Sequence, residues 1–292
     1  MSGLGPNVVS TDAFAAPDRG ALIRLRHVFK VYRIVDTGVI ALAGVDLDIE
    51  DGEFLAVVGP SGAGKSTILN LIGGLDRPSA GTIEVDGTDL TLLGDDDLTR
   101  YRAERIGFVW QGAARNLIPY LNIRENVRLP AVTSHGSGRR RDADELLELV
   151  GLADRARHRP GMLSGGEQQR AAIAIALANT PRILLADEPT AELDSASAVA
   201  VLDAFRAVNQ EFGVTIVMVT HDLVAASRAD RRVRVRDGHL LREGIPVDPV
   251  DEDGRVRLPD EALPWLADAE LEAEIHPDEV RLRRREGGPA DA

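Results

Sequence analysis

The nine residues from Gly59 to Thr67 read GPSGAGKST, and they hold one of only two lysines in a chain with 34 basic residues. Gly59 and Gly64 bracket four residues and are followed by Lys-Ser, which is the spacing G-x-x-x-x-G-K-[ST]. Glycine accepts the backbone angles of a tight anion-binding loop. The compact ammonium of Lys65 can lie between two phosphoryl groups, whereas a guanidinium prefers a bidentate face. The stretch therefore predicts a loop that binds a chain of phosphates.

The flanks of this loop support that interpretation. Residues 54–58 are apolar and predict a buried strand, and residues 66–72 predict a helix whose first amides face the same anion. Ser66 would then offer its hydroxyl to Mg²⁺. The alternative is a glycine-rich turn that opens an ordinary helix, and the buried strand before the loop and the helix after it count against it.

Composition bounds the class of protein. The 292 residues are 44% hydrophobic, enough for a core, and no apolar run approaches the roughly 18 residues of a membrane span. The first twenty residues lack the order of a secretory signal and the chain has no cysteine, so we expect a cytosolic location. A net charge of −13 argues against a general affinity for nucleic acid, which needs basic patches.

The pattern along the chain divides it into three parts. Residues 1–20 are small and polar and are expected to be disordered. From residue 21 to 244 strands come first, including a small hairpin predicted at the Asp86-Gly87 turn. Helices are expected over about 95–178, and near-continuous apolar strands follow at 183–186 and 214–219 with a helix between them. Residues 245–292 hold 14 acidic and 6 basic residues and form an acidic extension. Residues 134–141 carry no apolar side chain and predict an exposed loop.

A second motif places two carboxylates at the end of a strand. The stretch Ile183-Leu-Leu-Ala-Asp-Glu188 is apolar until its last two residues, and ligands of open α/β sheets bind at this end of the strands. Asp187 is suited to hold Mg²⁺ through its water shell, and Glu188 could act as the base for an attacking water. A polar strand terminus without function is the alternative.

A third motif, Leu163-Ser-Gly-Gly-Glu-Gln168, predicts the start of a helix. Ser164 and Glu167 have the spacing of a capping box, which would occur whatever the function. The pair Gly165-Gly166 is not explained by capping, because glycine weakens a first helical turn and leaves amides bare for an anion.

Five motifs in this order resemble those of ATP-binding cassette (ABC) ATPases, over about residues 22–244. They are GPSGAGKST at 59–67, FVWQ at 108–111, LSGGEQ at 163–168, LLADEP at 184–189 and VTHD at 219–222. Further stretches at 69–78, 116–119 and 124–127 are similar to the ATPases of lipoprotein-release and macrolide-efflux systems. The resemblance implies an α/β fold: a P-loop NTPase core with an N-terminal antiparallel β subdomain and a helical subdomain, here with a small C-terminal extension.

The resemblance also implies the ligands and the site. ATP and Mg²⁺ would bind with Lys65 on the β- and γ-phosphates, Glu188 as general base and His221 as γ-phosphate sensor. Tyr32 would stack on adenine, and Gln111 would reach the metal and the attacking water. The phosphate loop would comprise Gly59, Ser61, Gly62, Gly64, Lys65, Ser66 and Thr67. The metal would be held by Ser66, Gln111 and Asp187. The ATP bound by the opposite subunit would be contacted by Ser164, Gly165, Gly166 and Glu167, with Ser164 and Gly166 on its γ-phosphate.

Partners follow from the same resemblance. A second ATPase subunit would complete a dimer, expected to be a homodimer, and a membrane permease would place the protein on the cytoplasmic face of the membrane. Glu192 adds a charge near the subunit contact, so a heterodimer stays open. Two other functions also stay open: an ATP-gated signalling subunit that does not transport, and a soluble ABC ATPase. The extension is either a solvated acidic tail or a small β-rich dimerisation element similar to the swapped-hairpin domains of transition-state regulators. Its sequence predicts a turn within 253–259, a short helix over 260–266 and two strand-like pieces over 275–282 around residues 277–278.

Overall fold

The structure is a computed structural model that describes residues 8–9, 20–34, 37–112, 116–133, 140–241, 245–246, 271–276 and 279–284. Its chain divides into two compact units, one of residues 19–240 and one that combines residues 1–18 with 241–292.

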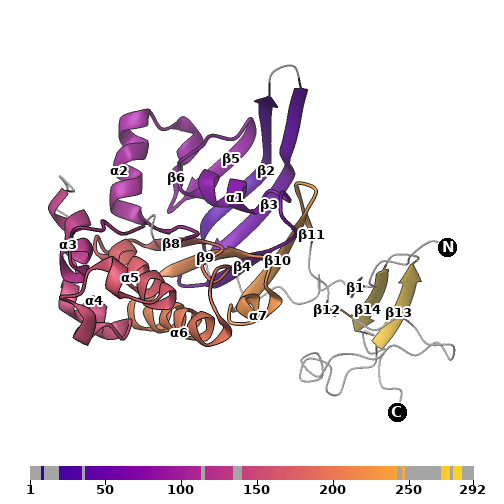
Figure 1. The fold of residues 1–292 in the computed structure, drawn as a ribbon. Helices are drawn as coiled ribbons and strands as arrows, with labels where there is room; N and C mark the ends of the chain where they lie inside the picture. The colour runs from indigo at the N-terminus through magenta and orange to yellow at the C-terminus, as the bar shows by residue number, and fades with distance from the viewer. Residues whose placement is uncertain are drawn as a thin grey trace, which may run out of the picture. The chain divides into compact units, whose positions relative to one another are not determined.

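A six-stranded sheet forms the centre of the larger unit (Figure 1), in the order β11-β10-β4-β9-β8-β7. Neighbours from β10 to β7 are parallel. The strands are β4 (Phe54–Val58), β7 (Ile106–Val109), β8 (Ile183–Asp187), β9 (Thr215–Thr220), β10 (Arg231–Arg236) and β11 (His239–Leu241). Every residue of β4 and β9 is buried, which explains the unbroken apolar sequence of β4 and of residues 216–219 in β9.

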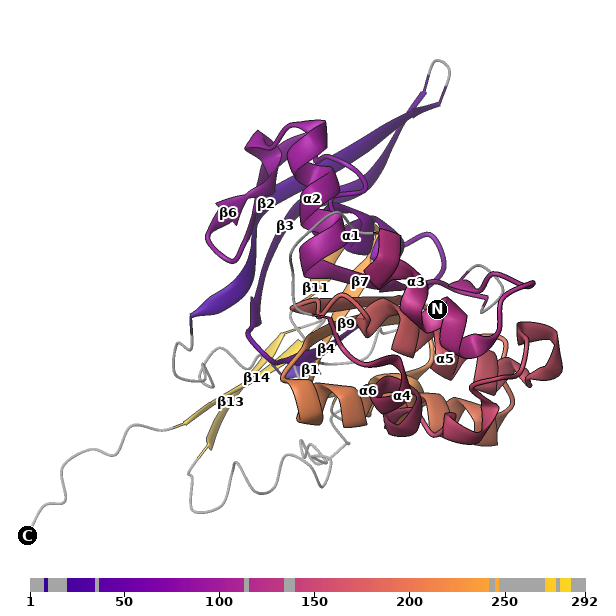
Figure 2. The same ribbon diagram turned by 90° about the vertical axis from the view of Figure 1, so that its left-hand side faces the viewer.

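A second, antiparallel sheet has the order β3-β2-β5-β6. Its long strands β2 (Ala21–Ile34) and β3 (Thr37–Glu50) run side by side (Figure 2). The predicted hairpin at Asp86-Gly87 is confirmed: β5 (Ala80–Val85) pairs with β6 (Thr88–Asp89), and the two turn residues have φ of 51° and 74°. Positive φ at both positions is what a two-residue hairpin loop requires.

Helices cover both faces of the central sheet. They are α1 (Lys65–Ile72), α2 (Asp95–Arg105), α3 (Ile123–Thr133), α4 (Ala143–Leu149), α5 (Gly165–Leu177), α6 (Ser195–Phe212) and α7 (Leu223–Ala226). The alternation of β4 shows how the core is built. Phe54, Ala56 and Val58 pack in one cluster with α3 to α6, whereas Leu55 and Val57 pack in another with α1 and the antiparallel sheet.

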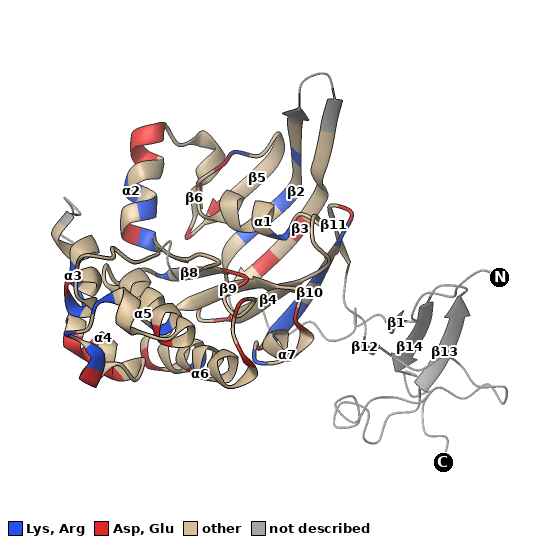
Figure 3. Ribbon diagram, in the orientation of Figure 1, with Lys and Arg blue, Asp and Glu red and all other residues tan. Residues whose placement is uncertain are grey.

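Local signals set the helix ends. The predicted crossover helix is confirmed as α6, where Asp194 caps the start by accepting a hydrogen bond from the Ser197 amide at 3.0 Å. α6 ends at Gly213, whose φ of 61° stops the helix. In α2 the first turn is acidic and the last turn basic (Figure 3), which complements the helix dipole.

Two expectations differ from the structure of the larger unit. The region expected to be helical, residues 95–178, includes β7, because its short apolar segment pairs with β8. The expectation of a fully exposed loop at 134–141 is wrong at Arg141, since its guanidinium lies 3.8 Å from the centre of the Phe212 ring and donates to the Leu177 carbonyl. A long side chain can bury its stem and its planar head on an aromatic face, and here burial lowers the pKa of Arg141. Residues 134–139 lie outside the described residues.

The described residues of the smaller unit form two pairs of strands. β1 (Val8–Val9) pairs with β12 (Ile245–Pro246), so part of the segment expected to be disordered is extended and paired. The two strand-like pieces expected around 277–278 are confirmed as the hairpin of β13 (Leu271–His276) and β14 (Glu279–Arg284). The helix and turn expected over 253–266 lie outside the described residues.

Candidate functional site

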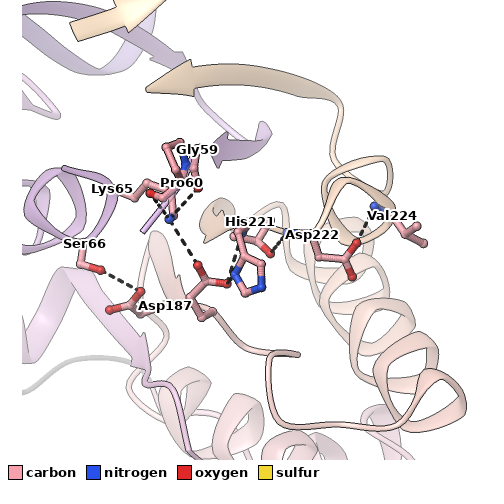
Figure 4. A network of polar contacts seen from close by, with 10 residues as sticks. Gly59, Pro60, Lys65, Ser66, Asp187, His221, Asp222 and Val224 are labelled. Atoms are coloured by element: carbon pink, nitrogen blue, oxygen red, sulfur yellow. Dashed lines mark hydrogen bonds and ion pairs between the residues drawn. The ribbon is translucent and has the colours of Figure 1, made fainter. Parts of the chain in front are cut away.

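The predicted phosphate loop follows β4, and the predicted carboxylates and histidine follow β8 and β9. Because these strands are parallel neighbours, their carboxyl ends meet at one edge of the sheet. Figure 4 shows that Lys65, Ser66, Asp187 and His221 converge there. The structure thus brings together the residues that sequence analysis placed in three separate motifs.

Glycines in the loop are required by its geometry. A Cβ on Gly59 would lie 2.2 Å from the carbonyl oxygen of Val235, so no other residue fits without moving β10. Gly64 has a φ of 103°, and a Cβ there would lie 2.4 Å from the carbonyl oxygen of Ala41. These contacts hold the loop against two strands while α1 begins at Lys65.

Lys65 is buried at the centre of the loop, with 6% of its surface exposed. Its ammonium donates to the carbonyl oxygens of Gly59 at 2.8 Å and Pro60 at 3.1 Å, and lies 3.4 Å from Oε1 of Glu188. A buried charge needs such partners. The ammonium therefore sits between the phosphate loop and the carboxylate at the end of β8.

Glu188 connects the loop to His221. Its Oε2 lies 2.9 Å from Nδ1 of His221 and accepts a hydrogen bond from the His221 amide at 3.3 Å. Its own amide donates to the Val219 carbonyl at 3.0 Å, and its φ is 44°. A non-glycine residue in this left-handed region costs about 1–3 kcal/mol, and such strain clusters at functional sites.

Ser66 and Asp187 form an oxygen pair beside these residues. The Ser66 hydroxyl donates to Oδ1 of Asp187 at 3.1 Å. Hydroxyl and carboxylate oxygens suit Mg²⁺, which takes one or two protein ligands and completes its shell with water and substrate phosphates. Within the described parts of the chain, no three His, Cys, Asp or Glu side chains gather in a way that could hold a metal by themselves. The donor set therefore fits a magnesium ion bound together with a phosphate substrate.

The capping box predicted at the start of α5 is confirmed. Ser164 Oγ accepts from the Glu167 amide at 3.2 Å, and Glu167 Oε2 accepts from the Ser164 amide at 2.8 Å. The Ser164 amide is also the main reason that the pKa of Glu167 lies below its usual value. Gly165 is exposed, whereas Gly166 is buried and a Cβ there would lie 2.8 Å from Cβ of Ser197.

Comparison with known proteins identifies the family. The sequence pattern of the family described as ABC transporter matches residues 42–191, more than half of the chain. This chain belongs to the ABC transporter family. It is the ATP-binding cassette subunit of such a transporter and an ATPase, and its fold is that of the ABC ATPases.

Related ABC proteins come from both archaea and bacteria. An uncharacterized ABC transporter ATP-binding protein of Methanocaldococcus jannaschii, MJ0796, is 45% identical over 228 residues, which is 76% of this chain and 96% of that protein. YknY of Bacillus subtilis, also uncharacterized, is 47% identical and is covered over 95% of its length. The macrolide export ATP-binding/permease protein MacB of Rhodopirellula baltica is 47% identical over 77% of this chain, which spans 33% of MacB.

Solved structures of ABC cassettes support the same fold. MJ0796 in a dimeric post-hydrolysis state bound to ADP and Pi superposes with a TM-score of 0.67 at 43% identity, over 76% of this chain and 97% of that one. CbiO1 of Clostridium perfringens, part of the transporter complex cbiONQ, has a TM-score of 0.69 at 27% identity, over 77% of this chain and 89% of that one. Cassettes of the family thus form dimers and belong to transporter complexes.

Two further predicted site residues, Gln111 and Tyr32, come from other strands than the residues around Glu188. Gln111 is exposed after β7, and the following Gly112 lies beside Glu192, since a Cβ on Gly112 would be 3.9 Å from its carboxylate oxygens. Before it, Trp110 stacks on Phe108 with ring centres 4.6 Å apart. Tyr32 lies on β2 with the Thr67 hydroxyl within hydrogen-bonding reach.

Sequence reasoning did not single out Lys30 and Asp76, which contact the predicted site residue Tyr32. The rarity of lysine in the chain was a signal that pointed to Lys30. Among the residues that the structure describes, no helix is both long and apolar enough to cross a bilayer.

Proposed function

We propose that two copies of this chain bind two ATP molecules between them and hydrolyse them to drive a membrane permease from the cytoplasmic face. Each site combines the phosphate loop of one copy with the start of α5 of the other. The observation that carries the proposal is the position of Glu188, whose carboxylate lies between the Lys65 ammonium and the His221 ring. A base held there is next to the charge that would bind the γ-phosphate.

In this proposal Glu188, Lys65 and His221 each have a separate role in hydrolysis. Glu188 accepts a proton from water as the water oxygen attacks the γ-phosphorus and ADP leaves. Lys65 stabilises the negative charge of the phosphates, and His221 contacts the γ-phosphate while it orients the Glu188 carboxylate. Such transfer depends mainly on positioning and charge stabilisation.

Other residues bind and align the nucleotide. Tyr32 stacks on adenine through its ring face. Ser66, Asp187 and Gln111 would hold Mg²⁺, which would supply neutralisation of phosphate charge, and Gln111 would also reach the attacking water. The phosphates lie on Gly59, Ser61, Gly62, Gly64 and Thr67. The partner copy closes the site with its Ser164, Gly165, Gly166 and Glu167.

The type of transporter is proposed from relatives. Three MacB proteins, macrolide export ATP-binding/permease proteins, are 44–47% identical to this chain in the part that aligns, which is 33–36% of their length. We infer that this chain powers an exporter of the lipoprotein-release or macrolide-efflux type.

A charge substitution at the start of α5 tests the shared site. In a Glu188→Gln background, ATP should convert the monomer into a dimer. Gly165→Asp places a negative charge against the γ-phosphate of the opposite copy and should abolish this dimer, while ATP binding to the monomer stays unchanged. The new carboxylate lies in the first turn of a helix, where negative charge is tolerated. Size-exclusion chromatography with light scattering and titration calorimetry would measure both.

Gly161→Asp is the matched control for this experiment. Gly161 is an exposed glycine shortly before α5, and a Cβ there would meet no atom within 4 Å. The same charge at this position should leave the ATP-driven dimer intact. ATP-driven dimerisation of the Gly165→Asp variant at wild-type ATP concentrations would refute the shared site.

A further inference from the structure

Lys30 is the second of the two lysines, and it is nearly as enclosed as the first, with 11% of its side chain exposed. Its ammonium donates to Oδ1 of Asp76 at 2.6 Å and to the Arg77 carbonyl at 2.8 Å. The same atom lies over the Tyr32 ring, 4.9 Å from its centre. A compact ammonium can make these three contacts at once, whereas a planar guanidinium is bulkier.

Asp76 holds three groups with its two oxygens. Oδ1 accepts from Lys30 and, at 2.7 Å, from the Arg77 amide, while Oδ2 accepts from the Tyr32 hydroxyl at 2.9 Å. Burial works against ionisation of this carboxyl, but the hydrogen bonds from Lys30, Arg77 and Tyr32 keep its pKa below the usual value. Asp76 is therefore ionised at neutral pH.

The backbone of Asp76 is fixed to the helix that carries the phosphate loop. The Leu75 amide donates to the Asn70 carbonyl at 2.9 Å, and the Asp76 amide donates to the same oxygen at 3.3 Å. Asn70 belongs to α1, which begins at Lys65. The carboxylate thus reaches from the end of α1 to a side chain on β2.

Tyr32 is consequently held at two places. Its hydroxyl is bound by Asp76, and one face of its ring lies against the Lys30 ammonium. Burial is the main reason that its pKa is raised, and Asp76 raises it further although Thr67 acts in the opposite direction. The phenol therefore stays protonated and donates to Asp76 at neutral pH.

We propose that Asp76 and Lys30 are positioning residues that fix the Tyr32 ring at a set distance from the phosphate loop, so that it receives the nucleobase of a nucleotide whose phosphates the loop binds. The inference rests on the proposed stacking of Tyr32 on adenine. Fixing the ring before the ligand arrives lowers the entropy cost of binding. Asp76 and Lys30 should therefore strengthen the binding of ligands that carry a base and leave the binding of ligands without a base unchanged.

A comparison of two ligands separates this role from a structural one. ATP contacts both Tyr32 and the loop, whereas inorganic tripolyphosphate contacts only the loop. We expect Tyr32→Phe, which keeps the ring and removes the hydroxyl, to raise the Kd for ATP about 3- to 10-fold. Asp76→Ala should do the same. Both should leave the Kd for tripolyphosphate within twofold of wild type, measured by titration calorimetry on the full chain.

The double variant tests whether Asp76 acts through the Tyr32 hydroxyl. Tyr32→Phe with Asp76→Ala should bind ATP no more weakly than the weaker single variant, because one contact cannot be lost twice. Asp203→Ala, on α6, is the control: it removes the carboxylate of an exposed ion pair with Arg228 and should change neither Kd. Tyr32→Phe alone keeps the proposal testable if Asp76→Ala does not fold.

Three outcomes would overturn the inference. Unchanged ATP binding in Tyr32→Phe and Asp76→Ala removes the positioning role, and additive losses in the double variant show that Asp76 acts elsewhere. Equal weakening of ATP and tripolyphosphate by Asp76→Ala assigns the residue to the loop itself. Tyr32→Ala distinguishes these failures from a failure of the proposed function: an unchanged ATP Kd in that variant removes the base contact itself.

Discussion

Replacement of Glu188 by glutamine keeps the shape of the side chain and removes its ability to accept a proton. In the native protein Oε2 of Glu188 lies 2.9 Å from Nδ1 of His221, and the glutamine amide can keep this contact, so the local geometry should be preserved. A positioned general base contributes about 10²- to 10⁴-fold to a rate, so we expect turnover to fall at least about 100-fold, or about 3 kcal/mol in the barrier. The Lys65 ammonium loses an anionic neighbour at 3.4 Å, so ATP binding should be unchanged or tighter.

Two measurements check this expectation. Phosphate release at saturating Mg-ATP, with the partner permease where the subunit alone turns over slowly, gives the rate, and titration calorimetry gives the Kd for ATP. Glu211→Gln, at an exposed carboxyl near the end of α6, is the control and should retain wild-type values of both. Turnover of Glu188→Gln within threefold of wild type would show that another group accepts the proton.

Three further substitutions test the metal, the packing and the charge state. Asp187→Asn, or removal of Mg²⁺ with EDTA, should lower turnover at least about 100-fold and leave the fold intact; full turnover in EDTA would contradict the metal site. Arg141→Ala should lower the free energy of unfolding by about 1–2 kcal/mol through the lost contact with Phe212, measured by urea denaturation against Arg157→Ala. The folded pKa of Glu167 is depressed, so its stabilisation is present above the unfolded pKa and is lost as pH falls through the folded value. Glu167→Gln should therefore lose less thermal stability than wild type between pH 5 and pH 3, and an equal loss would contradict that assignment.

The fold could be predicted for those elements whose burial or capping leaves a regular pattern in the sequence. The apolar runs of β4, β8 and β9 and the loop before α1 indicated a parallel sheet with a phosphate loop. β10 was missed because its sequence, RRVRVR, is dominated by arginine. Its buried residues are the two valines, Val233 and Val235, which alternate with arginines. Alternation of apolar and charged residues was the available signal, and it is typical of a strand.

The site was predictable as a set of residues but not as a set of contacts. Motif order indicated that Lys65, Glu188 and His221 would meet, since each follows or ends a strand of one sheet. That the Lys65 ammonium contacts Glu188 could not be deduced, because side-chain direction depends on the packed loop. Lys30 and Asp76 were missed for the same reason: 46 residues separate them along the chain.

The left-handed backbone at Glu188 sets a limit on engineering this protein. Glycine adopts such a conformation at little cost, and asparagine adopts it more readily than most residues, so either would relieve part of a strain of about 1–3 kcal/mol while losing the contacts with Lys65 and His221. A laboratory selection for heat resistance alone would accept such a replacement wherever the relieved strain exceeds the lost contacts, and under the proposed role of Glu188 the selected molecules would no longer hydrolyse ATP. Any such programme has to screen for turnover in the same round, or hold this codon constant.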